Sequence, residues 1–154
     1  MTSSAPLPCD PARADAFAHR MHDVLNHAAL ALMLSIGHRT GLFDVMAQLA
    51  ALPEGRTGST SAELAQHAGL DERYVREWLG ALATAGVVEL DPAARAYRLP
   101  PEHATSLTRA ARPRNAAATC QWIAVLGGVE SEVVACFAAG GGVGSESFER
   151  FHAV

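Results

Sequence analysis

Histidine is the residue type in this sequence that offers the most chemistry. The chain has 154 residues and seven histidines, four of which lie close together at His19, His22, His27 and His38. An imidazole titrates near neutral pH, so it can bind a metal, take a proton from a hydroxyl group or hydrogen-bond a ligand. His19 and His22 would share a helix face, but apart from Asp23, which points elsewhere, no carboxylate or thiol supports them. We therefore expect no metal site, and hydrogen-bonded structural histidines are the simpler interpretation.

Aromatic side chains form the second candidate group. Trp122, Phe137, Phe148 and Phe151 lie on or near the last predicted helix. They could fill the core of a dimer, or they could line an apolar pocket for a flat organic ligand at a dimer interface, where such clefts often form. The sequence leaves both interpretations open.

The elements that must position these residues are mainly helical. Apolar residues at three- and four-residue steps predict a long helix that starts at Ala12 and is closed by Gly37. A short helix from Gly41 to Ala51 follows. Residues 1–11 are rich in proline and serine, so we expect them to form a disordered lead-in. The stripe of the long helix consists of Phe17, Met21, Val24, Leu25, Ala28, Leu32 and Ile36.

Two short capped helices in the middle of the chain predict a helix-turn-helix. Thr60 and Glu63 have the spacing of a capping box, and Gly69 ends the helix that they begin. Asp71 caps the next helix, which Gly86 ends. A tight turn between two such helices is typical of a helix-turn-helix. Its expected core consists of Leu64, Ala65, Leu70, Val75, Leu79 and Leu82.

A small hairpin and a last long helix complete the predicted fold. Residues 87–90 and 96–99 have the composition of two strands, and the hairpin that they form would be the wing of a winged helix. Asn115 caps a helix from Ala116 to about Ala139, in which Gly127 and Gly128 can introduce a bend. The fold class is therefore mainly α, with a winged-helix domain over residues 12–139 and a glycine-rich connector or tail over residues 140–154.

Charge argues against a nucleic-acid partner. The formal net charge is −4. The second helix of the helix-turn-helix carries three acidic residues, Asp71, Glu72 and Glu77, against Arg73 and Arg76, and it contains no asparagine or glutamine. Recognition helices usually present arginine, lysine and amide side chains to bases and phosphates. We therefore expect a winged-helix scaffold that serves dimerisation, without DNA binding.

No membrane segment is predicted. The most apolar run, AALALMLSIG, has about half of the length that spans a bilayer. The N-terminus has no basic segment followed by an apolar one, so it does not resemble a signal peptide. We expect a cytoplasmic protein whose three cysteines are reduced.

The two long helices predict self-association. Together they carry more apolar surface than one small winged-helix module can cover, and such a surface left in water promotes aggregation. We expect it to meet a second copy of the chain, in an intertwined homodimer.

Four segments resemble a known family, the class I S-adenosylmethionine-dependent methyltransferases, in their N-terminal region. The similarity is greatest to bacterial members with an N-terminal winged-helix domain, related to small-molecule O-methyltransferases. The segments are residues 26–46, 60–82, 86–104 and 136–152. The resemblance implies that this region mediates dimerisation and that its helices help to wall a substrate pocket. It also implies that a Rossmann-like domain, which would follow this region, holds the cofactor.

The resemblance also suggests site residues. It places His27 and His38 near the substrate wall, as candidate catalytic residues that orient or deprotonate a hydroxylated substrate. They are eleven residues apart, so a helix that stayed regular past Gly37 would carry them on one side. His22, Trp122 and Phe137 join them as candidate substrate-binding residues.

We expect no cofactor site in this chain. A nucleotide-type cofactor site of this class needs a strand, a glycine-rich turn and a helix, whereas the glycines from Gly140 to Gly144 follow a helix. They would form a connector, or a lid or hinge near the substrate if a second domain is supplied. S-adenosylmethionine would bind only with that catalytic domain.

Three functions follow from these observations. The chain could be the dimerisation and substrate-binding domain of a methyltransferase, either as part of a longer protein or with a separate catalytic subunit. It could be a stand-alone descendant that binds or transforms a small molecule in a biosynthetic pathway without S-adenosylmethionine. It could also be a winged-helix transcriptional regulator, which the acidic second helix argues against. The sequence leaves open whether the chain is an enzyme.

Overall fold

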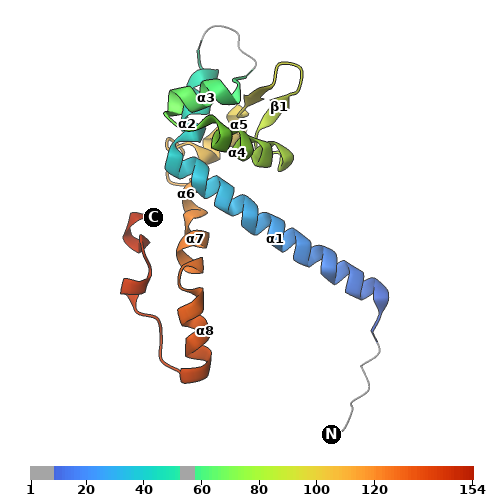
Figure 1. Cartoon of the computed structure of the whole chain (residues 1–154), viewed down its shortest axis with the longest axis vertical. Helices are drawn as coiled ribbons and strands as arrows, with labels where there is room; N and C mark the ends of the chain where they lie inside the picture. The colour runs from blue at the N-terminus through green and yellow to red at the C-terminus, as the bar shows by residue number, and fades with distance from the viewer. Residues whose placement is uncertain (1–8, 53–57) are drawn as a thin grey trace.

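A computed structural model describes residues 9–52 and 58–154, and the architecture is mainly helical (Figure 1). Most of the predicted lead-in, residues 1–8, lies outside the described residues. Ten helices and strands, together with two short 3-10 turns, make up the described chain. They are α1 (Pro11–Thr40), α2 (Leu42–Ala50), α3 (Ser61–Ala68), α4 (Glu72–Thr84), β1 (Glu89–Asp91), β2 (Ala96–Arg98), α5 (Pro101–Leu107), α6 (Ala116–Thr119), α7 (Gln121–Gly127), α8 (Glu130–Ala139), η1 (Ser145–Ser147) and η2 (Phe151–Ala153).

The helix-turn-helix is confirmed together with its capping signals. The Thr60 hydroxyl accepts the Glu63 amide at 3.3 Å, and the Glu63 carboxylate accepts the Thr60 amide at 2.8 Å. Gly69 ends α3 in the left-handed region, where a side chain would be strained. The Asp71 carboxylate then caps α4 by accepting the Arg73 amide at 3.0 Å.

The wing is present, but it begins two residues later than predicted at its first strand. In the two-stranded antiparallel sheet, Glu89 pairs with Arg98 and Asp91 with Ala96. Val87 and Val88 do not join the sheet because their amides bond the Leu82 carbonyl at the end of α4. Val88 is instead buried in the core.

The predicted core of the helix-turn-helix is also confirmed, with Leu70 only partly buried. Trp78 of α4 is buried and donates from its indole Nε1 to the Met33 carbonyl of α1 at 2.9 Å, so α1 and α4 are joined across the core. The largest fully buried side chains are Phe43, Leu42, Leu64, Leu79, Leu82 and Val75.

Gly37 does not end the first helix, contrary to the prediction. The helix continues to Thr40, and Gly41 ends it with φ at 76°. Gly37 is buried, and a Cβ atom added there would lie 2.5 Å from atoms of both Phe43 and Trp78. The glycine therefore lets two aromatic rings approach the helix, which is a packing requirement and not a termination signal.

The last predicted helix is divided into three. Asn115 caps its first piece, α6, as expected. Breaks at Cys120 and at Gly128 separate α6, α7 and α8, and α8 is bent by 47° from the preceding segment. The second break confirms the bend expected at Gly127 and Gly128, where two glycines lower helix propensity.

Two helical arms leave the winged helix and diverge (Figure 1). We call residues 11–29 of α1 the α1 arm and residues 121–139 the α7–α8 arm. The two arms converge at the winged helix, where α1 packs on α6 and α7. The segment after α8 turns back and runs beside the α7–α8 arm.

Among the described helices, none is by itself both long and apolar enough to cross a bilayer. Helices α6–α7 and α8, taken together as one bent pair, meet the length and composition requirement.

Candidate functional site

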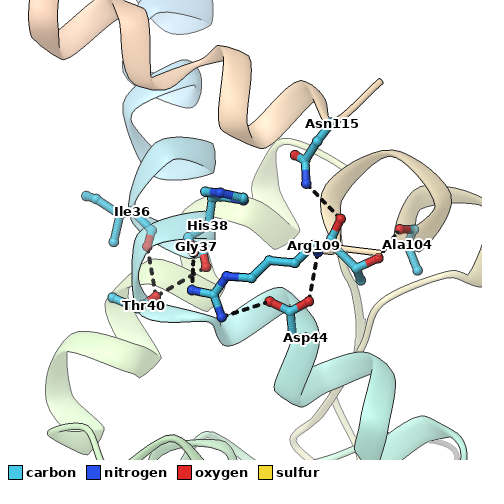
Figure 2. Close-up of polar contacts among 9 residues, drawn as sticks. Ile36, Gly37, His38, Thr40, Asp44, Ala104, Arg109 and Asn115 are labelled. Atoms are coloured by element: carbon cyan, nitrogen blue, oxygen red, sulfur yellow. Dashed lines mark hydrogen bonds and ion pairs between the residues drawn. The ribbon is translucent and has the colours of Figure 1, made fainter. Parts of the chain in front are cut away.

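A polar junction ties the C-terminal end of α1 to α2 and to the turn after α5. It contains Arg109, from the turn after α5, with Asp44 of α2 and His38 of α1 (Figure 2). The Arg109 guanidinium donates to the His38 carbonyl at 2.9 Å and lies 3.4 Å from the Asp44 carboxylate. The Arg109 amide also donates to that carboxylate, at 2.8 Å. One arginine thus connects three segments that lie far apart in the sequence.

Arg109 acts as a cap for α1. Its cation lies at the helix C-terminus, where unpaired carbonyls concentrate negative charge. Gly41 ends the helix with φ at 76°, a conformation in which a side chain would be strained, and a Cβ atom there would also lie 3.0 Å from an Arg109 nitrogen. Thr40 adds a second contact by donating its hydroxyl to the Ile36 carbonyl at 2.8 Å (Figure 2). The end of α1 is therefore fixed by polar contacts as well as by packing.

His38 is the ionisable residue that the junction perturbs. Its Nδ1 atom is buried and has no hydrogen-bond partner among the described residues. Burial lowers the pKa of His38 below its ordinary value, and the Arg109 cation lowers it further, while Asp44 opposes them. These effects favour the neutral form of His38, which can accept a hydrogen bond but supplies no positive charge.

The structure does not bring the predicted site residues together. His22 and His27 are exposed on the α1 arm, whereas His38 is half-buried at the base. Because α1 stays regular, His27 and His38 do lie on one side, but eleven residues at about 1.5 Å each separate them by roughly 16 Å. These two histidines cannot contact one small substrate group within a single chain.

Three of the four aromatic candidates form a cluster, and the fourth lies apart from it. Trp122 packs edge-on against Phe151 at 5.0 Å between ring centroids, and Phe148 adjoins Phe151 at 6.2 Å. Arg150 donates to the buried Gln121 side chain at 2.8 Å, so the returning segment is held against α7. Phe137 takes no part in this cluster, because 89% of its surface is exposed on α8.

Metal ligands do not converge in residues 9–52 and 58–154, where no group of three or more histidine, cysteine or acidic side chains is placed to hold an ion. His19 is used locally, since its Nδ1 lies 2.8 Å from the Asp15 carbonyl.

The outer face of the helix-turn-helix carries paired charges. Arg76 binds Glu72 at 2.9 Å within α4, and Arg98 binds Glu89 at 3.0 Å across the wing. Residues 58–99 contain four arginines and six acidic residues. Tyr74 is the most exposed large hydrophobic side chain on α4, at 74%. This surface therefore lacks the excess of free cations that phosphate contacts require.

Sequence reasoning missed the junction itself. Asp44 and Arg109 are 65 residues apart, and neither belongs to a motif with a recognisable spacing. The one available signal was Gly41, since a glycine followed by an acidic first turn marks the meeting of two helices.

A helix-turn-helix followed by a two-stranded wing and framed by packed helices defines a winged-helix protein. A family model described as "Rv2258c-like winged HTH domain" matches residues 28–109, which is more than half of the chain. The chain therefore belongs to this family. The match ends at Arg109 and leaves out most of the α1 arm and all of the α7–α8 arm. A search among curated proteins found no significant match.

Proposed function

We propose that this chain is a homodimerisation module in which the winged helix is a scaffold for the two arms. The observation that carries the proposal is the excess of exposed surface. A compact monomer of 16.2 kDa exposes roughly 7,500 Å², whereas this chain exposes 10792 Å². When residues 1–8 and 53–57 are set aside at about 150 Å² each, the other residues expose roughly 8,800 Å². A compact monomer of their mass would expose roughly 7,000 Å², so an excess of roughly 1,800 Å² remains. A stable interface buries about 800 Å² per partner.

The surface on the α1 arm is apolar on one side. At about 100° per residue, the apolar stripe that starts at Phe17 in the arm and ends at Leu32, just beyond it, covers roughly 100° of the circumference of α1. Leu30, Met33 and Leu34, which pack on the winged-helix core, lie on the other side of the helix. Phe17, Val24 and Leu25 are 54%, 54% and 66% exposed, so nothing within the described chain covers the stripe.

The opposite side of the α1 arm is polar. Asp15, His19, Asp23 and His27 repeat every four residues and centre roughly 170° from the apolar stripe. A partner that covered the stripe would leave these groups in water, as a dimer interface requires. This arrangement supports a second copy as the partner, with an intertwined dimer as the expected form.

The α7–α8 arm supplies a second uncovered face. Val133, Val134 and Phe137 are exposed on α8, and Leu126 is exposed on α7. Because the arms diverge (Figure 1), the faces of one copy can enclose an arm of the other. Such an interface would give the arms the contacts that they lack within one chain.

The dimer would serve a substrate-binding domain like those of small-molecule methyltransferases. This step rests on the resemblance of residues 26–46, 60–82, 86–104 and 136–152. In that arrangement S-adenosylmethionine would bind only to a Rossmann-like catalytic domain, from the same protein or from a separate subunit. His38, whose neutral form is favoured at the base of the arms, would face the substrate. A stand-alone protein that binds or transforms a small molecule without S-adenosylmethionine is the alternative.

Matched substitutions on the α1 arm test the proposal. Val24→Asp with Leu25→Asp places charge in the stripe, so we expect the dimer to dissociate into monomers. His19→Asp with His27→Asp adds the same two acids on the polar side and should leave the dimer intact. The readout is the molar mass by light scattering, with circular dichroism to show that the helices persist. If the two double variants have the same molar mass, whether monomer or dimer, the α1 stripe is not the interface.

The regulator alternative is tested separately. The paired and acidic surface of α4 and the wing predicts no shift of DNA fragments from the gene's own neighbourhood at physiological salt. A salt-dependent, sequence-specific shift that is lost in Arg73→Ala with Tyr74→Ala would establish a transcriptional regulator in place of the scaffold.

A further inference from the structure

We propose that the groove between α2 and α5 binds a small apolar carboxylate, with Arg112 as its charge partner. The groove has a volume of about 640 Å³. This volume falls within the range of small-molecule sites, roughly 300 to 1,000 Å³. The groove lies on the winged helix and apart from the arms, so the proposal does not depend on the dimer.

The walls of the groove are apolar and small. Ala47 and Ala50 come from α2, Pro101 and Ala104 from α5, and Leu99 from the segment that leads into α5. Helices α2 and α5 are in contact, which fixes the spacing of the two walls. Because the facing side chains are mostly methyl groups, they leave room for the flat body of a ligand.

Charge selects the head group of that ligand. Arg112 is the only ionisable side chain among the described residues that line the groove. The hydroxyls of Thr105 and Thr108 already donate to the carbonyls of Glu102 and Ala104, at 2.6 and 2.8 Å. The guanidinium is therefore the available donor at the rim, and a carboxylate is the group that matches its planar fork.

Arg112 differs from the paired arginines of the fold. Arg76, Arg98 and Arg109 each bind a carboxylate within the chain. The side chain of Arg112 has neither an ion pair nor a hydrogen bond within residues 9–52 and 58–154. In a chain of net charge −4, an unpaired cation beside an apolar groove favours an anionic ligand.

The turn that carries Arg112 is anchored at both ends. Arg109 is held by Asp44 on one side, and the Asn115 side chain donates to the Thr108 carbonyl at 2.7 Å on the other (Figure 2). Within the turn, the Ala111 amide donates to the same carbonyl at 2.9 Å. These contacts hold the turn against the groove before a ligand arrives, which lowers the entropic cost of binding.

The test compares two probes of one shape, 2-naphthoate and 2-naphthamide, by ¹H–¹⁵N NMR titration of the full chain. We expect naphthoate to shift the amides of Ala47, Ala50, Ala104 and Ala111, and naphthamide to bind at least about tenfold more weakly. Shifts confined to the arms, equal affinity for both probes, or no shift at millimolar naphthoate would overturn the proposal.

Three variants assign the site. Arg112→Ala should weaken naphthoate binding by about tenfold or more and leave naphthamide unchanged. Arg114→Ala, an exposed arginine outside the groove lining, is the matched control and should bind naphthoate as the parent does. Ala50→Leu fills the groove from an exposed helix position and should weaken both probes. Equal losses in the two arginine variants would show a general charge effect and contradict the assigned site.

Discussion

Single residues in this fold are best understood through the contacts that they permit, and Gly37 shows this most directly. A methyl group there would lie 2.5 Å from atoms of Phe43 and Trp78. We predict that Gly37→Ala lowers the free energy of unfolding by about 1 to 3 kcal/mol, because overpacking outweighs the better helix propensity of alanine. Denaturant unfolding measures the change.

Gly80 is the matched control for that substitution. It lies within α4, and a Cβ atom there would meet nothing within 4 Å. Gly80→Ala should therefore stabilise the fold by roughly 0.5 to 1 kcal/mol. If both glycine variants changed stability with the same sign, close packing would not be the reason for Gly37.

The junction around Arg109 gives a second prediction at this scale. Asp44→Ala removes the acceptor of both the Arg109 amide and its guanidinium. We expect a loss of about 1 to 2 kcal/mol in the free energy of unfolding. Arg114→Ala, at an exposed arginine with no such contact, should stay within about 0.5 kcal/mol of the parent. A neutral Asp44→Ala would mean that packing alone fixes the end of α1.

His38 makes stability depend on pH with a definite sign. Burial, reinforced by Arg109 and opposed by Asp44, lowers the pKa of His38 in the folded chain below its ordinary value of 6.5. The unfolded chain therefore takes up a proton first, so this residue's contribution to stability falls as pH drops from about 6.5 through the folded pKa. His38→Asn should flatten that slope, whereas the exposed His27→Asn should not. Urea unfolding of each variant at several pH values measures how the free energy of unfolding depends on pH.

At the scale of elements, local signals explain the helix-turn-helix. The capping box at Thr60 satisfies two amides at the start of α3. Thr60→Ala should cost about 1 kcal/mol of stability, and Thr60→Ser should retain most of it, because the serine hydroxyl caps equally well. Thermal unfolding distinguishes the two. An equal loss of stability in Thr60→Ala and Thr60→Ser would assign the effect to the threonine methyl group instead of the hydroxyl cap.

The same scale shows which elements could be predicted. Thr60, Gly69, Asp71 and Asn115 act within a few residues of their own positions, so the sequence predicted the helix starts and the end of α3 correctly. The end of α1 was placed wrongly at Gly37, because that glycine is required by Phe43 and Trp78, which sequence alone does not place beside it. The two breaks in the last helix were only partly predicted, since Cys120 carries no terminating signal.

The candidate site was less predictable than the fold. The histidine and aromatic pattern named His22, His27, His38, Trp122 and Phe137, and the structure separates them along the two arms. The polar junction at the end of α1 depends on the contact between Asp44 and Arg109, which are 65 residues apart in the sequence. Such a pair depends on how α2 and the turn after α5 meet, which no local spacing encodes.

At the scale of the whole molecule, the winged helix and the two arms differ in how much of their apolar surface the chain covers. The family match at residues 28–109 covers the winged helix, and the arms on either side carry the exposed apolar residues. The core of the winged helix, which also takes in Ala117 of α6, is buried within one chain, whereas the arms have faces that nothing in the described chain covers. Association through the arms would explain both observations without any role for the helix-turn-helix in binding DNA.

The central claim is that the arms join two copies of the chain. The most direct measurement is the molar mass of the purified protein by light scattering after gel filtration, at micromolar concentration. The account predicts about 32 kDa, twice the 16.2 kDa of one chain. A mass of 16.2 kDa at that concentration, with the helices intact by circular dichroism, would contradict it.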